Sequence, residues 1–492
     1  MKSSRSSPKR SGKNSSEEVT AFDLFYQLTY MSATAAAGLP RGRLFELASR
    51  VDTPAAKHFQ EINELIDKMR YSSPEACRMV GEHVKSEDLH TFLLRLSDAL
   101  RSGEPLPPFL AREAEVQGDH YVNAYERDLQ SLSKWNDGYT SVSVSVALIV
   151  IINMVSTMIY PISQMAMGVM ILTAVVIGFA LAWVVSRAAP PEVYSIPWKQ
   201  GSKQQRFSKK LATLFLPITV ALTLALAMLH MPMSWLFILA ALPLVPLGIS
   251  CMIAESRLPR KGAEISAFFR SLGGTATSRG TTLGDALASI KIDSFPALEA
   301  DIKRLSLRLR AGAKPGSCWR LFGQETGSLL VSQAARVFYE ATNLGGDPEV
   351  SGVLSSLFAS KTALLRAKRG GVAATFTMLT LVMHGVISAL MVFILEILRR
   401  FTIMLQAAMD TLQSDPATAQ QGMSAMAFNI PQMSFLEQLT VGLLIVLALI
   451  SSYAIVASEG TNILKISFYL FIMLFMNGIA FLIIPALLVN VL

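Results

Sequence analysis

Only a few residues of this 492-residue chain have the type and spacing that chemistry requires. The most prominent set is a basic run made of Lys303, Arg304, Arg308 and Arg310. Arg304 and Arg308 are four residues apart, so on a helix they share one face. Cations in this arrangement bind either an acidic protein partner or anionic lipid, and both interpretations stay open. Nucleic acid is a weaker interpretation, because aromatic residues do not alternate with the basic ones.

No catalytic or nucleotide-binding signature accompanies this basic run. The P-loop pattern G-x-x-x-x-G-K-[ST] does not occur, so we expect no ATP hydrolysis by that route. Gly284-Asp285 resembles part of an aspartyl peptidase motif, but Thr282 replaces its first glycine, which favours a turn at a helix start. His83 and His90 are seven residues apart and form no metal motif. We therefore expect no enzyme activity, no cofactor and no metal.

The apolar residues are concentrated in long segments. They make up 51% of the chain, and only 16% of the residues are charged, which is typical of a membrane protein. A bilayer is spanned by about 20 apolar residues of helix. Seven segments fit: Val142–Ile162, Met165–Val185, Leu211–His230, Trp235–Ala254, Gly371–Leu398, Leu439–Ala457 and Ile466–Leu488. Residues 1–18 form a basic tail that we expect to be disordered, without the apolar core of a signal peptide.

Lysine and arginine placement predicts the orientation of these segments, because basic residues stay on the cytoplasmic side. Six Lys or Arg and one acid lie in the connector 187–210. The block 256–370 has 17 basic and 9 acidic residues, a net charge of 17 − 9 = +8. We expect a cytoplasmic amino terminus and an external loop at 399–436. Arg399 and Arg400 oppose this assignment unless they extend back to the membrane surface.

Two polar blocks, 19–140 and 256–370, read as helical bundles. Leu89, Phe92 and Leu96 recur at helical spacing, with Ser86 as a helix start, and we expect about six helices in the first block. No stretch alternates as a strand does. The fold class is therefore all-α. The expected order is bundle 19–140, membrane hairpin 141–186, connector 187–210, hairpin 211–255, bundle 256–370, helix 371–398 and, after the external loop, hairpin 437–492.

The second half of the chain repeats the plan of the first. Gly38 corresponds to Gly280 and Gly103 to Gly345, each at an offset of 242 (280 − 38 and 345 − 103). All four are expected to end helices. The acids Asp98 and Glu340 keep the same offset (340 − 98 = 242). A duplicated bundle with its own attached membrane helices is the simplest explanation.

Three polar residues within the membrane segments stand out, Asn153, His384 and Asn477. Such residues mark function by default, but they also hold helices together by hydrogen bonds, which is the favoured interpretation here. No segment carries the repeated acids or bases of an ion pathway. A transporter or channel stays an alternative, because Pro217, Pro243, Pro246 and Pro485 could break their helices.

The stretches AAGLP…LFELAS and SRGTTLGDALAS, together with LSDALRSGEPLPPFLAREAE, resemble the type II secretion system F domain. Two such blocks in one chain look most like the archaeal assembly platforms of archaella and type IV pili. The resemblance implies a six-helix cytosolic bundle, a hexameric secretion ATPase as partner and pilin or archaellin subunits in the membrane. It implies a non-enzymatic platform for filament assembly. Membrane lipid is a further expected partner, a homodimer is possible, and no nucleic acid is expected.

Overall fold

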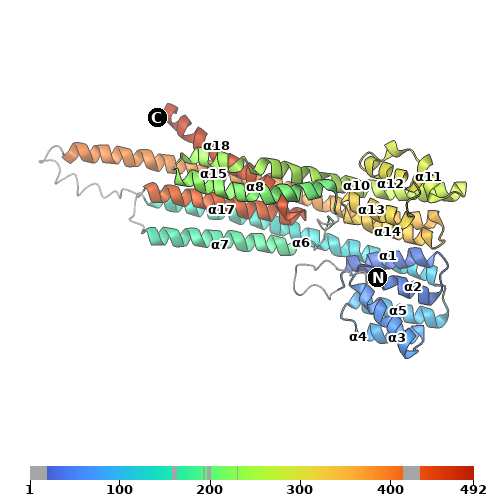
Figure 1. Ribbon diagram of the computed structural model, residues 1–492. Coiled ribbons are helices and arrows are strands. Elements are labelled where there is room, and N and C mark those ends of the chain that lie inside the picture. The colour runs from blue at the N-terminus through green and yellow to red at the C-terminus, as the bar shows by residue number, and fades with distance from the viewer. Residues whose placement is uncertain are drawn as a thin grey trace. The chain divides into compact units, whose positions relative to one another are not determined.

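The computed structural model describes residues 19–157, 163–191, 194–196, 201–229, 231–413 and 433–491, and within them it is helical and has no β-strand. The chain divides into two compact units. The first, here called the bundle unit, comprises the residues up to Arg127 together with Arg257–Arg366. The second, the membrane unit, comprises Asp128–Ser256 and the residues from Ala367 onward. The prediction of an all-α, polytopic membrane protein is confirmed (Figure 1).

The first copy in the bundle unit contains the six expected helices. They are α1 (Ala21–Ala35), α2 (Arg41–Ala48), α3 (Ala55–Met69), α4 (Ser73–His83), α5 (Glu87–Ser102) and the start of α6 (Leu106–Ser156). Thr20 and Ser72 cap α1 and α4 with capping boxes, in which each hydroxyl accepts a hydrogen bond from the third backbone N–H of its helix. The apolar faces enclose one core that includes Phe45, Phe59 and Phe92, all fully buried.

The second copy begins within a helix that also belongs to the membrane unit. Its elements are α10 (Leu244–Arg279), α11 (Leu283–Ser289), the 3-10 turn η1 (Ile292–Ser294), α12 (Glu299–Arg310), α13 (Pro315–Thr326), α14 (Leu329–Asn343) and the start of α15 (Pro348–Gln413). Its core is more aromatic than that of the first copy. Phe269 stacks on Phe338 with ring centroids 5.0 Å apart, and Trp319 meets the edge of Phe322 at 5.9 Å.

Helix starts in the two copies correspond at one offset. It is 242 residues for α2 and α11 (283 − 41), for α4 and α13 (315 − 73), for α5 and α14 (329 − 87), and for α6 and α15 (348 − 106). The start of α12 departs slightly, at 244 (299 − 55), and α10 starts earlier than its counterpart α1 because it extends into the membrane unit. The same order of helices with nearly constant spacing supports the duplication that the turn glycines predicted.

One pair of equivalent glycines lets neighbouring helices pack closely in both copies. A Cβ on Gly81 of α4 would lie 3.1 Å from Leu93 Cβ of α5. A Cβ on Gly323 of α13 would lie 2.9 Å from Ser332 Cα of α14. The two glycines are 242 residues apart (323 − 81), so both copies use the same close helix contact. Sequence reasoning missed this pair, because a glycine inside a helix has no local signature of packing.

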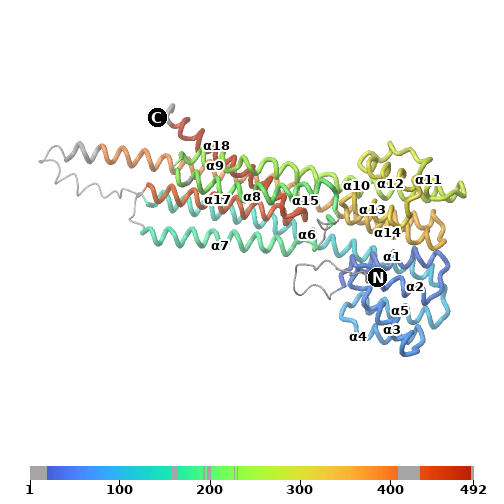
Figure 2. Tube along the Cα trace, in the orientation of Figure 1, coloured from blue at the N-terminus to red at the C-terminus, as the bar shows by residue number. Residues whose placement is uncertain are grey.

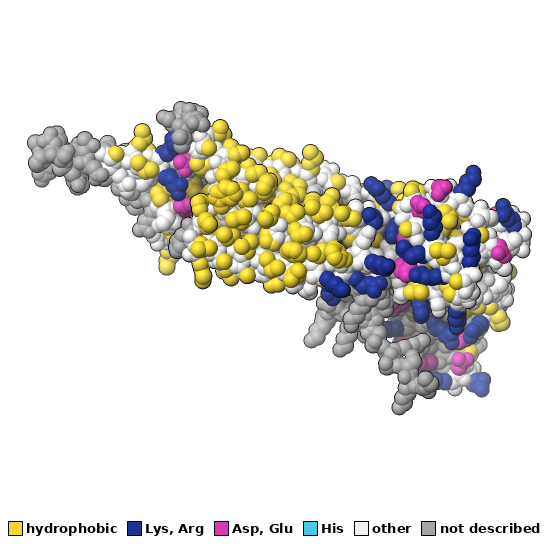
Figure 3. Space-filling model, turned by 45° about the horizontal axis from the view of Figure 1, so that its top comes forward, with side chains coloured by type: hydrophobic (Ala, Val, Ile, Leu, Met, Phe, Trp, Pro, Cys, Tyr) yellow, Lys and Arg dark blue, Asp and Glu magenta, His cyan; other side chains and the backbone are white. Residues whose placement is uncertain are grey.

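The membrane unit is built from the long apolar helices. Six of its described helices are long and apolar enough to span a bilayer, and a seventh span is formed if α9 (Met233–Ala241) and α10 are counted together. The others include α7 (Gln164–Ala188), α8 (Lys203–Met228), α17 (Met433–Glu459) and α18 (Ile466–Val491), with the 3-10 turn η2 (Ile463–Lys465) before α18. Their exposed apolar side chains gather over these helices, as expected for lipid contact (Figure 3).

One expected boundary and three of the four proposed helix breaks differ in the structure. Residues 399–413, assigned to the external loop, continue α15 as helix, because neither Gly nor Pro interrupts the chain there; residues 414–432 lie outside the described part. Among the four prolines proposed as helix breaks, only Pro243 lies at one, where α9 and α10 bend by 41°. Pro217 and Pro485 lie inside continuous helices, and Pro246 lies in the first turn of α10. The trace of these helices is shown in Figure 2.

Candidate functional site

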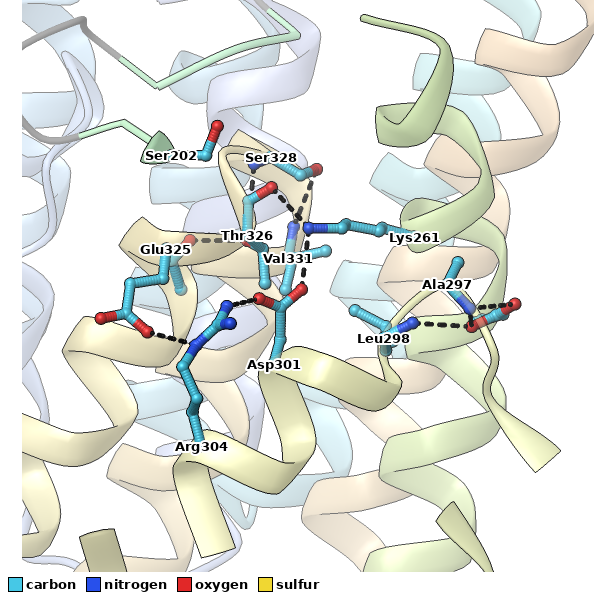
Figure 4. A network of polar contacts seen from close by, with 12 residues as sticks. Ser202, Lys261, Ala297, Leu298, Asp301, Arg304, Glu325, Thr326, Ser328 and Val331 are labelled. Atoms are coloured by element: carbon cyan, nitrogen blue, oxygen red, sulfur yellow. Dashed lines mark hydrogen bonds and ion pairs between the residues drawn. The ribbon is translucent and has the colours of Figure 1, made fainter. Parts of the chain in front are cut away.

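Three of the four cations of the basic run on α12 are paired with acids within the bundle unit. Lys303 pairs with Glu299 one turn earlier on the same helix. Arg304 pairs with Asp301 and donates from Nε to Glu325 at 3.0 Å (Figure 4). Arg308 donates from its two terminal nitrogens to the same Glu325 at 3.0 and 2.6 Å. Arg308 and Glu325 thus form a bidentate pair, the strongest geometry for these groups.

The network continues inward from Arg304 to a buried carboxylate (Figure 4). Asp301 is only 4% exposed, and Lys261 Nζ of α10 lies 2.7 Å from its carboxylate. Lys261 also donates to the Thr326 carbonyl at the end of α13, at 3.1 Å. A buried carboxylate is tolerated only when it is paired and hydrogen-bonded. Asp301 and its partners Lys261 and Arg304, which both also contact α13, therefore tie α10, α12 and α13 together.

Glu325 is the acid that holds the two arginines. Burial raises the pKa of its carboxyl, but the hydrogen bonds and charges of Arg308 and Arg304 outweigh burial and hold the pKa below its ordinary value. Arg304 and Arg308 thus pair with an acid of their own bundle. The sequence did not predict this pairing, because Glu325 is 17 residues from Arg308 along the chain. Of the four cations in the run, Arg310 alone has no ion pair recorded within the described part of the chain.

The four turn glycines all take the left-handed backbone conformation. Their φ angles are +73° at Gly38, +76° at Gly103, +59° at Gly280 and +95° at Gly345. Each glycine lies within three residues of the end of a helix. A residue with positive φ at such a position ends the helical pattern of backbone hydrogen bonds. A side chain at any of them would strain the backbone. Their role is thus to end helices at equivalent points of the two copies.

The equivalent acids Asp98 and Glu340 have different surroundings. Asp98 is an exposed partner of Arg101 on the same helix. Glu340 of α14 accepts a hydrogen bond from the Tyr30 hydroxyl of α1 and from Arg336 Nε at 3.0 Å. Burial, followed by the charge of Glu340, raises the pKa of Tyr30. The two acids therefore occupy equivalent positions, on α5 and α14, but make different contacts.

Glu340 marks the place where the two copies pack against each other. Around it, Phe358 of α15 lies among aromatic rings of α1, with centroids 5.3 Å from Phe25 and 5.4 Å from Tyr26. Lys361 of α15 also pairs with Asp119 of α6 at 2.6 Å. These contacts join residues more than 230 positions apart in sequence, which local patterns cannot predict.

Two of the three polar residues predicted within the membrane segments meet. His384 Nε2 of α15 and Asn477 Oδ1 of α18 lie 3.1 Å apart, and both residues are buried. Asn153 is half-buried, and no side-chain hydrogen bond is recorded for it within the described residues. The geometry of the first two is an interhelical hydrogen bond. Within the described part of the chain, no group of three or more His, Cys, Asp or Glu is placed to hold a metal ion.

Arg369 is a buried cation that the sequence analysis overlooked. It lies on α15 in the membrane unit, is 1% exposed, and donates to the carbonyls of Ser458 at 3.0 Å, Ala457 at 3.1 Å and Pro190 at 2.9 Å. Two of these carbonyls belong to the last turn of α17, whose negative dipole end favours a cation. Gly460 leaves room for the guanidinium, since a Cβ there would lie 2.4 Å from Arg369 Cζ.

Together these features define the class: a polytopic α-helical membrane protein with two helical bundles whose helices follow one another in the same order. Residues 28–154, from within α1 to near the end of α6, match the family described as type II secretion system protein F. The match thus covers the first copy from within α1 onward and extends into the membrane unit.

The chain is also homologous to two archaeal proteins. Flagella accessory protein J of Methanocaldococcus jannaschii is 30% identical over 327 residues, which cover 64% of this chain and 58% of that protein. The protein of the same name from Methanococcus voltae is 27% identical over 329 residues, again covering 64% and 58%. The chain therefore spans less than two thirds of the length of these relatives. No solved structure matches it.

Proposed function

We propose that this chain is a non-enzymatic platform of the cytoplasmic membrane on which archaellum-like or type IV pilus-like filaments are assembled. The match of residues 28–154 to the protein F family and the homology to two flagella accessory proteins support this assignment. In this proposal the amino terminus and both bundle copies face the cytoplasm, and membrane lipid surrounds the apolar helices. The remaining partners are a hexameric secretion ATPase, which supplies the energy, and pilin or archaellin subunits in the bilayer.

The observation that carries the proposal is the continuity of two helices. α6 is helical over 51 residues from Leu106 to Ser156, and α15 over 66 residues from Pro348 to Gln413. Each belongs to the bundle unit at its start and to the membrane unit beyond it. An unbroken helix transmits displacement along its axis, because its backbone hydrogen bonds leave no free hinge. A protein that couples an ATPase to membrane subunits requires such a connection in each copy.

The basic run on α12 has fewer cations free for docking than the sequence suggested. Lys303, Arg304 and Arg308 are exposed or partly exposed, so they can still contact an ATPase or anionic lipid beside their internal partners. Reversing the charge of Arg304 or Arg308 would, however, remove one of the two counter-ions of Glu325 and place a second acid beside it. Such variants would change the bundle itself. Arg310 is the member whose replacement tests docking without breaking a recorded ion pair.

Transport is not favoured by the described residues. A cleft of about 330 Å³ in the membrane unit is lined by polar residues of α6, including Asn136 and Thr140, and by Gly371, Thr375 and Phe376 of α15. A transport path requires a polar lining that several helices share, and this cleft is lined by two. The His384–Asn477 pair forms a hydrogen bond between α15 and α18 and does not line it.

The proposed coupling is tested by breaking one of the continuous helices. Lys134 is an exposed residue of α6 in the membrane unit. Lys134→Pro removes a helix hydrogen bond and introduces a kink, whereas Lys134→Ala removes the same side chain and keeps the helix. We expect the proline variant to bind the cognate secretion ATPase normally but to assemble no filaments in cells, and the alanine variant to assemble them. Failure of the unaltered protein to bind that ATPase, with or without nucleotide, would contradict the proposal. Normal filaments in the proline variant would exclude coupling through α6.

A further inference from the structure

The turn between α3 and α4 in the first copy has a counterpart between α12 and α13 in the second. Arg70 has φ +60° and Gly312 has φ +73°, and the two are 242 residues apart (312 − 70). Among the described residues Arg70 is the one non-glycine residue with positive φ. The second copy forms the turn from Ala311, Gly312 and Ala313, and the first from the three larger residues Met69-Arg70-Tyr71.

The second copy shows that this turn does not require large side chains. In both copies the turn is closed by backbone hydrogen bonds, from Tyr71 N–H to the Leu65 carbonyl at 3.2 Å and from Ala313 N–H to the Arg308 carbonyl at 3.1 Å. A Cβ in the left-handed region is unfavourable, and glycine avoids that cost. The turn with arginine at this position is therefore less stable than the same turn with glycine.

The three side chains of the first copy's turn point away from its core. Met69 is 66% exposed and Tyr71 38% exposed, and Arg70 is also exposed. No hydrogen bond or ion pair of the Arg70 side chain is recorded within the described part of the chain. Arginine, tyrosine and methionine are enriched in protein–protein interfaces, where arginine and tyrosine often dominate the binding energy. The turn thus combines a strained backbone with an exposed surface of the composition that interfaces favour.

We propose that the Met69–Arg70–Tyr71 turn is a docking site for a cytoplasmic protein that presents a carboxylate beside an apolar recess. The planar guanidinium of Arg70 would pair with the carboxylate in bidentate geometry. Met69 and Tyr71 would fill the recess on either side of that pair. The identification of this partner as the assembly ATPase rests on the proposed function.

The charge around the turn favours a protein partner over the bilayer. Between residues 55 and 83, which include α3 and α4, the chain has five Asp or Glu and four Lys or Arg, a net charge of 4 − 5 = −1. Basic segments that bind anionic lipid carry clusters of four to eight cations. A segment without net positive charge is not attracted to an anionic surface over distance, but its Arg70 can pair with one carboxylate at short range.

The duplication supplies the experiment, because the turn of the second copy can be grafted onto the first. The triple variant Met69→Ala, Arg70→Gly and Tyr71→Ala gives the first copy the Ala-Gly-Ala sequence of the second. A matched control is Arg101→Ala, which removes an exposed arginine of the same bundle, paired with Asp98. The full chain is placed in nanodiscs of neutral lipid and, in a second series, of anionic lipid. The affinity for the purified cognate ATPase and the melting temperature of the bundle unit are measured in both.

We expect the graft to weaken ATPase binding at least tenfold and to raise the melting temperature by about 2 °C, since the left-handed turn is relieved. Arg101→Ala should leave the affinity unchanged. Equal affinity of graft and unaltered chain would overturn the docking site while leaving the proposed function intact. A parallel loss of affinity and melting temperature would show a structural role and also overturn it. An effect seen only in anionic lipid would assign the turn to the bilayer. No binding by the unaltered chain would overturn both proposals.

Discussion

Gly273 of α10 is the residue where a single methyl group should do most damage to the bundle unit. A Cβ there would lie 2.3 Å from the Pro348 carbonyl oxygen and 3.2 Å from Glu349 Cα, at the start of α15. The contact is reciprocal, since a Cβ on Gly352 of α15 would lie 2.6 Å from the Phe269 carbonyl oxygen. The obstacles are backbone atoms of a facing helix, which cannot rotate away as a side chain can. Gly273→Ala would therefore increase the separation of α10 and α15 by roughly 1 Å at this point.

The neighbouring residue provides the control that isolates this effect. Gly274 is also helical, and a Cβ there meets nothing within 4 Å. Both substitutions gain about 1 kcal/mol of helix propensity, which cancels when the variants are compared. The remaining difference is the overpacking at Gly273, which we place at about 2–3 kcal/mol because backbone must move. For a unit of this size that corresponds to a melting temperature between about 4 and 12 °C lower in Gly273→Ala than in Gly274→Ala.

The assay can be made specific for the bundle unit. Trp319 is 3% exposed and is the tryptophan that this unit contains, as the other four fall in the sequence of the membrane unit. With those four replaced by phenylalanine, tryptophan fluorescence during heating reports the core in which Trp319 packs. Equal melting temperatures for the two alanine variants would refute the close crossing of α10 and α15.

Three further perturbations test the polar contacts. Because its arginine partners hold the pKa of Glu325 below the unfolded value, the stability that its ionised form contributes is present above the unfolded pKa, near 4.3, and is lost as pH falls through the folded pKa. Glu325→Gln should therefore melt lower than the parent at pH 7, and the difference should shrink at pH 3; a constant difference would contradict this origin. Arg369→Ala leaves three carbonyls without their donor, and we expect a loss of about 3 kcal/mol or more and faster hydrogen exchange at the end of α17, with unchanged exchange there as the opposing result. His384→Leu removes the partner of Asn477 and should lower the melting temperature of the membrane unit by the equivalent of about 1 kcal/mol, whereas His384→Gln, which can still donate, should retain most of it.

Local features of the sequence predicted the elements well. Apolar segments of bilayer length identified the membrane helices, because hydrocarbon thickness sets their length. Gly38, Gly103, Gly280 and Gly345 were identified as helix ends, and each has the positive φ that such an end requires. Their common offset of 242 (280 − 38 and 345 − 103) indicated a duplication. In the structure, most equivalent helices of the two copies start at nearly the same offset. These features depend on residues that are close together along the chain, so they can be predicted from the sequence alone.

The partners of the polar residues could not be predicted in this way. The basic run on α12 looked like a free docking face until α13 supplied Glu325, and Glu340 differs from its equivalent Asp98 because α1 packs against α14. The sequence by itself determined an all-α membrane protein with two related bundles, through the length and periodicity of its apolar segments. Only the tertiary structure decided which charges are paired and why Gly273 matters where Gly274 does not, because both depend on which helix lies opposite.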